Sequence, residues 1–351
     1  MSFWRSSRTT GGTSRLLIDI GGTSVAGACA YFALDSPPVL CYDRRAPITT
    51  HENEPPEAAM ERALELVCDT LEKDGVAALA RAAGSGRIDE AIISIDAPWQ
   101  QTIVHMEEKR SGAPDGQART FTFTKRTLAD ILGSSRAAIE EDPGREVKQH
   151  VVGIRLNGYE TTDPFGKSAH RAALIILISW IQSRIVEAVG TIVRKRFHIH
   201  HPTYVSGLTL RYRALSATFP HERDVLILDA VGHAVALSLV RARTLVAVRE
   251  FPSGEGEAAW VEAVSAALKE IAASYPLPRT ILLVADEPEA RTHMKTLQSS
   301  GFSALWFTEE PLRIIPVSRL PTTNLTIALE TIPDIRLSLM TQYASLPHMG
   351  D

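Results

Sequence analysis

The chain has 351 residues, of which 44% are hydrophobic and 22% are charged, and its net charge at pH 7 is −4. This composition is typical of a folded globular protein, and the length is sufficient for two or three domains with cores of their own. The net charge gives no overall basic field, which argues against nucleic acid or an anionic lipid surface as the main partner.

Cysteine usage and hydropathy indicate where the protein works. Cys29, Cys41 and Cys68 lie far apart and form no C-x-x-C pair, so the sequence disfavours a disulfide framework and a zinc site and favours a reducing cytoplasm. The most apolar segment, residues 172–181, is shorter than the roughly 20 residues that cross a bilayer. Residues 1–14 lack the apolar core of a secretory signal and are predicted to form a flexible tail.

The most informative motif is a glycine hairpin near the start of the chain. An apolar strand that carries one acid continues through a glycine turn into a second strand, and the polar and glycine positions are Asp19, Gly21, Gly22, Thr23 and Ser24. Glycine lets backbone N–H groups approach an anion closely, hydroxyl groups add donors, and the acid would face a metal ion or its water shell. The same pattern also makes an ordinary tight hairpin, so the motif alone leaves both interpretations open.

The segments after the hairpin predict a βββα beginning. Residues 37–42 form a third expected strand, and residues 55–74 have apolar positions near one helical face. A short buried strand over residues 91–95 ends at Asp96, where Pro98 stops the strand.

The character of the chain changes at residue 121, which predicts an inserted subdomain. The expected elements are a loop over 112–119, a strand at 121, a helix over 125–132, an acidic loop that ends at 143, a strand over 151–156, a long helix over 167–196 and a strand over 203–206. The long helix is apolar on nearly every face between residues 172 and 181, so we expect it to be buried against a sheet. Gly166-Lys167-Ser168 is not a P-loop because Thr161 stands where that motif needs glycine; a turn at Gly166 and a helix cap at Ser168 are expected.

A second hairpin repeats the first one. The apolar strand over residues 225–228 ends in Asp229, and a turn through Gly232 leads into another apolar segment. A helix over 258–274, a strand over 280–284 and a helix over 288–299 follow. The internal repeat predicts two similar βββαβα halves that enclose a cleft.

The two Asp-bearing hairpins and the late apolar strand resemble the actin-like ATPase superfamily. The resemblance is closest to the PilM- and FtsA-like proteins of type IV pilus assembly and cell division, and it extends to residues 157–167, 212–216 and 251–254. It implies an α/β fold of two RNase H-like halves around a central cleft, with a small inserted strand-helix-strand-strand subdomain. The implied division is a first actin-like domain over 15–118 and 206–222, an insertion over 119–205 and a second actin-like domain over 223–351.

The resemblance also implies a site in which the two hairpins hold the phosphates of ATP from opposite domains. The implied nucleotide-binding residues are Asp19, Gly21, Gly22, Thr23, Ser24, Asp229 and Gly232, and Asp19 and Asp229 would hold Mg²⁺ through water. Asp96 is the one candidate for a general base that orients a water molecule, and a turn acceptor is its alternative role.

Several departures from the family pattern predict weak nucleotide binding or none. Val231 replaces a glycine, which restricts the backbone, and Val235 replaces a threonine, which removes a hydroxyl donor. After the late strand, residues 285–288 place two acids where a double-glycine turn would lie against adenosine.

These features favour a cytoplasmic scaffold of the PilM or FtsA type that binds a partner peptide at the inserted subdomain and reaches the inner face of the membrane through that partner. Homo-oligomers are compatible with this role. Residues 332–351 contain one arginine and show no apolar helical face, which favours PilM over FtsA, whose relatives end in a basic membrane helix. The alternatives are a sugar or small-metabolite kinase of the same superfamily and an active actin-like ATPase.

Overall fold

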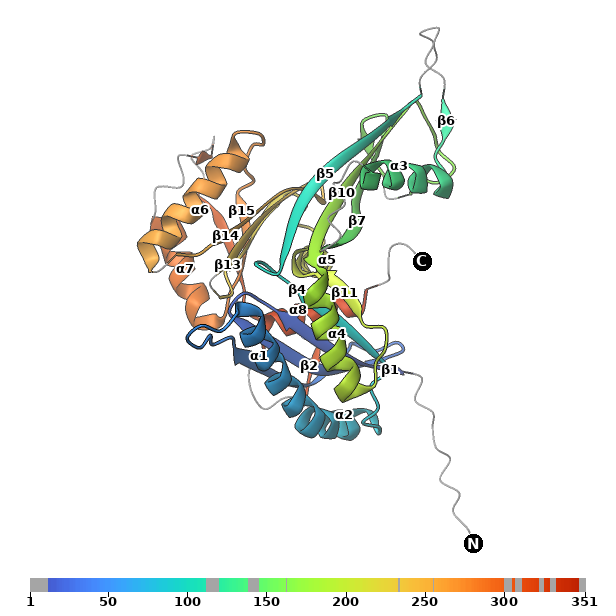
Figure 1. The fold of residues 1–351 in the computed structure, drawn as a ribbon. Helices are drawn as coiled ribbons and strands as arrows, with labels where there is room; N and C mark the ends of the chain where they lie inside the picture. Colours follow the sequence, from blue (N-terminus) through green and yellow to red (C-terminus); the bar gives the residue numbers. More distant parts are fainter. Residues whose placement is uncertain are drawn as a thin grey trace. The chain divides into compact units, whose positions relative to one another are not determined.

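The protein is represented by a computed structural model that describes residues 12–111, 120–137, 145–161, 163–232, 234–254, 256–299, 305–306, 311–321, 325–328 and 333–346. Contacts divide the chain into two compact units (Figure 1). Unit 1 consists of Met1–Ile95, Glu187–Thr218 and Ser318–Asp351, and unit 2 consists of Asp96–Val186 and Phe219–Val317. These two units do not coincide with the predicted actin-like domains and insertion. The predicted domain boundaries therefore stay a prediction.

Unit 1 is built on a six-stranded sheet with the order β11-β4-β1-β2-β3-β17. Its strands are β1 (Gly12–Ile20), β2 (Ser24–Ala33), β3 (Val39–Pro47), β4 (Glu90–Ile95), β11 (Thr203–Ser206) and β17 (Thr326–Ile327). The first three strands pair antiparallel, whereas β4 pairs parallel with both β1 and β11. The predicted strands at the start of the chain and at residues 91–95 and 203–206 are therefore confirmed.

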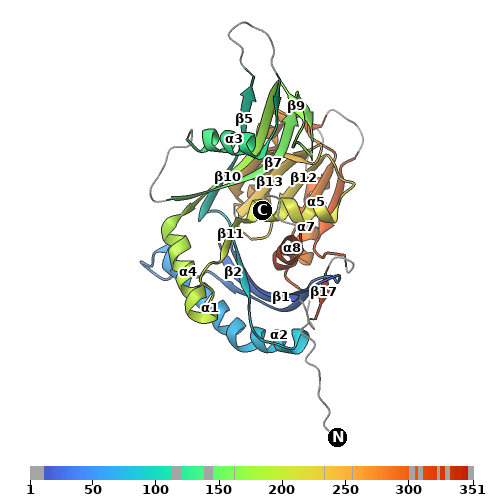
Figure 2. The same cartoon turned by 90° about the vertical axis from the view of Figure 1, so that its right-hand side faces the viewer.

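Helices cover both faces of this sheet (Figure 2). The helices of unit 1 are α1 (Pro56–Thr70), the π-helical segment η1 (Leu71–Gly75), α2 (Val76–Ala83), most of α4 (Ser183–Phe197), α5 (Gly207–Thr218) and α8 (Ile335–Ala344). α1, η1 and α2 lie on one face, and α5 and α8 pack against each other on the opposite face.

The predicted helix over residues 55–74 corresponds to α1 and η1, and the helix continues without a break into α2. Its buried stripe includes Met60, Leu64 and Val67, as the apolar period indicates. Gly27 in β2 allows the helix to approach closely, because a Cβ atom at this position would lie 2.7 Å from Cγ1 of Val67. The close approach explains why glycine stands in the middle of a buried strand.

The three thiols lie in the core of unit 1 and are predicted to be unreactive in the folded protein. Burial raises the pKa of Cys29 and of Cys68 to about 12 and that of Cys41 to about 11. Because the thiolate is the reactive form, we expect labelling by Ellman's reagent at pH 8 to be at least about 100-fold slower than for the unfolded chain. Full and rapid labelling of even one thiol without denaturant would contradict this packing; labelling in 6 M guanidinium is the control.

Unit 2 contains a four-stranded antiparallel sheet with the order β5-β10-β7-β8. The elements of this part are β5 (Gln100–Arg110), β6 (Phe121–Thr122), α3 (Lys125–Ala137), β7 (Arg145–Leu156), β8 (Tyr159–Glu160), β9 (Ser168–Ala169) and β10 (Arg171–Gln182). α3 packs against β5, and β6 pairs with β9 in a separate two-stranded ladder. The predicted short strand, helix and strand of the insertion are confirmed, and the predicted loops over 112–119 and through residue 143 lie mostly outside the described residues.

The predicted long helix over residues 167–196 is wrong in its first half. β10 occupies Arg171–Gln182, and the helix begins only at Ser183. The apolar run is explained by burial on both faces of this central strand. Leu174, Ile176 and Ile178 pack in the cluster under α3, while Ile175 lies beside Gly153 on the opposite face. A strand buried on both faces has the same all-apolar sequence as a buried helix segment.

Two further expectations need correction at the edges of elements. Ser168 lies in β9 and does not cap a helix, although Gly166 forms the expected turn with φ of 78°. The predicted tail lies outside the described residues up to residue 11, but Gly12 already begins β1.

The second sheet of unit 2 repeats the strand arrangement of unit 1. Its order is β14-β13-β12-β15-β16, with β12 (Val225–Asp229), β13 (Ala234–Arg241), β14 (Thr244–Pro252), β15 (Thr280–Val284) and β16 (Arg313–Val317). α6 (Glu257–Ala272) and α7 (Glu287–Ser299) enclose a core with this sheet that includes Leu228, Trp260 and Leu283. The predicted second hairpin, late strand and two helices are confirmed.

The described parts of the chain contain no helix that is both long and apolar enough to cross a membrane.

Candidate functional site

The first glycine hairpin has the form that the sequence predicts. Asp19 pairs with Ala26 across the ladder, and the N–H of Gly21 donates to the carbonyl oxygen of Ser24 at 2.9 Å, which closes the turn. The carbonyl oxygen of Thr23 accepts a hydrogen bond of 2.7 Å from the N–H of Ile48. The side chain of Asp19 is nearly inaccessible, with 2% of the residue exposed.

Arg45 of β3 lies against this hairpin and contacts two of its polar groups and Asp334. Its Nε is 2.5 Å from Oδ2 of Asp334, and one terminal nitrogen donates to Oγ of Ser24 at 2.6 Å. The other terminal nitrogen is 3.6 Å from Oδ2 of Asp19. One guanidinium group therefore links the hairpin to the residue that precedes α8.

α8 supplies a second guanidinium group to the same carboxylate. Arg336 Nη1 lies 3.9 Å from Oδ2 of Asp19 and 3.3 Å from the position that a Cβ atom of Gly21 would occupy. Asp334 fixes this helix, since its Oδ1 accepts the N–H groups of Arg336 and Leu337 at 3.0 and 3.1 Å. This is an ordinary aspartate N-cap, here shared with an ion pair.

The pKa values of two acids in this network are shifted in opposite directions. Burial alone would raise the pKa of Asp334, but the charge and hydrogen bond of Arg45 and the N–H of Leu337 outweigh it, so the pKa lies below the usual value. Burial raises the pKa of Asp43, which accepts the N–H of Asp334 at 2.9 Å. The lowered pKa means that Asp334 stabilises the fold above its unfolded pKa, and that this contribution is lost as the pH falls through the folded value.

The arrangement around Asp19 does not fit a divalent cation. Mg²⁺ is bound by carboxylate oxygens together with several waters in octahedral geometry. Here two guanidinium groups approach the same oxygen of Asp19, and each would repel a further cation at this place. A magnesium ion would require both arginines to move away.

The second hairpin holds its acid in a turn of its own. Asp229 is 1% exposed, and its Oδ1 accepts the N–H of Val231 at 3.2 Å. Gly232 has φ of 83°, a backbone conformation that favours glycine. The side chain of Val235 belongs to the core under α6 and α7, so this position supplies packing and no donor.

Asp96, the candidate general base, is buried directly after β4, where unit 2 begins. Its carbonyl oxygen accepts the N–H of Trp99 at 3.0 Å, which is the geometry of a turn. The role of a base at this position stays a prediction.

The structure thus brings five of the predicted nucleotide-binding residues together in one unit and two in the other. Asp19, Gly21, Gly22, Thr23 and Ser24 form the first hairpin of unit 1, whereas Asp229 and Gly232 lie in unit 2. The sequence did not reveal Arg45, Asp334 and Arg336. Arg336 is the single arginine of residues 332–351, and nothing in its local pattern indicated that it reaches the first hairpin.

No protein-family model matches the chain. No curated protein matches it by sequence.

Solved structures do match it along nearly its whole length. A PilM–PilN type IV pilus biogenesis complex aligns over 95% of this chain and 99% of the other, with 12% identity and a TM-score of 0.58. A Bacteroides thetaiotaomicron protein with an actin-like ATPase fold and unknown function covers 97% and 99% of the two chains, with 8% identity and a TM-score of 0.47. The ethanolamine utilization protein EutJ of Carboxydothermus hydrogenoformans covers 95% and 89%, with 13% identity and a TM-score of 0.40. The likeness to the PilM–PilN complex, together with two sheets that repeat one strand arrangement, shows that this chain has the actin-like ATPase fold.

Proposed function

We propose that the protein is an actin-like scaffold of the PilM or FtsA type that binds a partner peptide and has weak or lost ATP binding. The observation that carries the proposal is the pairing of Asp19 in the first hairpin with Arg45 of β3 and Arg336 of α8. In this proposal the protein works in the cytoplasm and reaches the inner face of the membrane through its partner.

Both hairpins support the loss of nucleotide binding. In the first, the guanidinium groups supply the positive charge that a hydrated magnesium ion would otherwise supply beside Asp19. In the second, the carboxylate of Asp229 already accepts a backbone N–H, and Val231 and Val235 supply no hydroxyl donor. The nucleotide and metal roles of these residues remain predictions.

The sequence predicts the peptide site in the insertion over residues 119–205; the site proposed here is the edge strand β5, which precedes that insertion in the chain and forms one sheet with its strands β10 and β7. β5 pairs only with β10 in that sheet as described, so its other edge is not part of the ladder. Ile103 and Met106 on this strand are 46% and 52% exposed, so they could supply apolar contacts to an added peptide strand. Addition of a peptide strand to a sheet edge, with pockets for its side chains, is a common recognition mode. The similar PilM was solved in complex with PilN, and we propose a partner of that kind.

Photo-crosslinking tests this assignment. With benzoylphenylalanine at Met106, the full chain irradiated in cells is expected to form one dominant adduct with a membrane-associated protein, which mass spectrometry identifies. The same probe at Leu66 of α1, which is equally exposed at 52%, is the matched control and is expected to give no such adduct.

The identified partner then allows a binding measurement. Met106→Asp is expected to weaken the affinity for the partner peptide at least about tenfold, because central apolar contacts dominate such interfaces, while Leu66→Asp leaves it unchanged. Equal cross-linking from both positions, or equal affinities of the two variants, would argue against β5 as the peptide site.

A further inference from the structure

The outer edge of β5 presents backbone hydrogen-bonding groups from every second residue. β5 is the outermost strand of its sheet and pairs antiparallel with β10 (Figure 1). Just beyond one end of this ladder, the N–H of Ser111 donates to the carbonyl oxygen of His170 at 2.9 Å. Just beyond the other end, the N–H of Gln182 donates to the carbonyl oxygen of Trp99 at 3.5 Å. Hydrogen-bonded and non-hydrogen-bonded pairs alternate along an antiparallel ladder, so the odd-numbered residues of β5 bond to β10, and the even-numbered residues direct their N–H and C=O groups toward the open edge.

The side chains along this edge combine exposed apolar groups with charged groups. Met106 is 52% exposed and Ile103 is 46% exposed. His105 and Glu107 lie on the same face of the strand as Ile103, because side chains alternate between the two faces. Nε2 of His105 is 3.0 Å from Oε2 of Glu107. The order of these groups along β5 determines which strand fits beside it.

A second copy of β5 fits this edge when Met106 lies opposite its own counterpart. The two strands are then antiparallel and related by a two-fold axis, and even-numbered residues face each other, as the outward backbone groups require. His105 of each copy lies opposite Glu107 of the other, so two imidazole–carboxylate pairs form beside the axis. The remaining charged residues of the strand lie opposite uncharged ones, with Glu108 opposite Val104, Lys109 opposite Ile103 and Arg110 opposite Thr102.

The neighbouring two-fold registers are less favourable. Centring the pair on either glutamate of the strand places two carboxylates directly opposite each other, which destabilises a sheet. Centring it on Val104 or His105 leaves Glu107 opposite an uncharged side chain. The register centred on Met106 brings imidazole and carboxylate together and covers the more exposed of the two apolar side chains.

We propose that two copies of this chain pair through β5 in this register and join their four-stranded sheets into one continuous sheet. The pairing covers Met106 and satisfies the outward backbone groups of both strands, which otherwise leave an edge open to uncontrolled association. A partner peptide competes with the second copy for the same edge, so self-pairing regulates peptide binding. This regulation rests on the proposed function, whereas the pairing itself does not.

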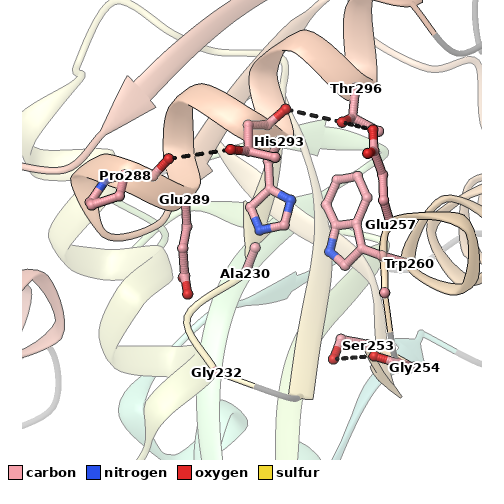
Figure 3. Close-up of a pocket in the computed structure, with 12 residues that line it drawn as sticks. Ala230, Gly232, Ser253, Gly254, Glu257, Trp260, Pro288, Glu289, His293 and Thr296 are labelled. Carbon is pink, nitrogen blue, oxygen red and sulfur yellow. Dashed lines mark hydrogen bonds between the residues drawn. The ribbon is translucent and has the colours of Figure 1, made fainter.

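The cavity beside the second hairpin is separate from this edge. Its volume is about 450 Å³, and its lining includes Gly232, Trp260 and Pro288 (Figure 3). Gly232 is one of the predicted nucleotide-binding residues, so the cavity belongs to the candidate site already described. None of its described lining residues comes from β5, and a ligand in the cavity therefore leaves the pairing edge accessible.

Disulfide trapping with the purified full chain tests the register. Met106→Cys places two thiols opposite each other with Cα atoms about 5.5 Å apart, within the range that a disulfide spans. Mild oxidation is expected to convert most of this variant into a covalent dimer, and the native cysteines are buried. Ile103→Cys is the matched control, because Ile103 is similarly exposed but lies about 20 Å from its own counterpart in this register. It is expected to form the covalent dimer at least about tenfold more slowly.

Analytical ultracentrifugation of the purified chain, without any partner, measures the strength of the pairing. The chain is expected to dimerise with a Kd below about 100 µM, as suits a transient interface. Val104→Pro is expected to raise the Kd at least about tenfold, and it leaves the bonds to β10 intact because the N–H of Val104 points away from that strand.

A charge exchange keeps the test informative if Val104→Pro fails to fold. Glu107→Lys is expected to raise the Kd at least about fivefold. His105→Glu added to Glu107→Lys is expected to restore the affinity, because opposite charges then face each other again.

The outcomes separate this proposal from the proposed peptide site. A chain that stays monomeric at about 200 µM, equal trapping of Met106→Cys and Ile103→Cys, or a charge exchange that fails to restore pairing would overturn the proposal, and the peptide site would stand or fall by the cross-linking in cells. In cells the adduct from Met106 is expected with the partner, because the partner displaces the second copy. A dimer that the identified partner peptide dissociates supports both proposals, whereas a dimer that the bound peptide leaves intact would overturn the regulation.

Discussion

Arg45→Met is expected to lower the free energy of unfolding by about 3 kcal/mol, at the low end of the range for breaking a buried ion pair. The low end applies because 26% of the Arg45 side chain remains exposed, whereas Asp334 and Asp19 are 14% and 3% exposed. The change leaves Asp334 without its closest cation and removes one of the two guanidinium groups beside Asp19. Urea denaturation followed by circular dichroism measures the loss.

A double-mutant cycle separates the ion pair from other effects of the change. Asp334→Asn keeps a good N-cap for α8 and removes the charge, so the double variant should lose less stability than the sum of the two single variants. Arg62→Met, which breaks the more exposed pair with Glu54, is the control and is expected to cost no more than about 1 kcal/mol. Equal losses for Arg45→Met and Arg62→Met would contradict the network described here.

The second large effect is expected at the C-terminal helix. Leu337→Ala should lower the free energy of unfolding by about 2–5 kcal/mol, because it leaves a cavity at a fully buried position of α8. All ten residues of this helix are buried, and it contacts β1, β2 and α5 of unit 1. The measurement is again the urea midpoint with an unchanged slope.

Leu34→Ala is the matched control for this helix. Leu34 is 77% exposed, so the same deletion of atoms is expected to change stability by less than about 0.5 kcal/mol. If Leu337→Ala were equally mild, α8 would not be a core element, and a surface role for residues 335–344 would have to be reconsidered.

The parts of the fold that were predicted correctly are those in which neighbouring residues form a recognisable pattern. The first hairpin combines an apolar strand with a glycine turn, and the predicted helix over residues 55–74 has a one-sided apolar period, so both could be recognised from neighbouring residues. The strand over residues 280–284 was predicted at its observed bounds for the same reason. These segments identified the two repeated halves, and the repeat pointed to the fold.

The errors occurred where burial or partners come from distant parts of the chain. β10 is buried on both faces, so its sequence shows neither the alternation of a half-buried strand nor a clear sign against a helix. α8 is likewise buried all round, so residues 332–351 show no one-sided apolar face that would indicate a helix.

Only the glycine, hydroxyl and acidic residues of the two hairpins were predicted at the candidate site. The pairing of Asp19 with Arg45 and Arg336 joins β1 to β3 and to α8, which lies at the other end of the chain. No pattern among neighbouring residues indicates such a long-range contact. The departures at Val231 and Val235 were visible in the sequence, and the arginines add an independent physical reason for the same expectation of weak nucleotide binding.

Calorimetric titration of the full chain with ATP and ADP in the presence of magnesium measures whether the first hairpin still binds nucleotide. We expect no detectable binding up to about 1 mM nucleotide, and the same result for Asp19→Ala, because the guanidinium groups already pair the acid on which a magnesium site would depend. Micromolar binding that Asp19→Ala abolishes would contradict this expectation and would indicate an active ATPase or a kinase of the same fold.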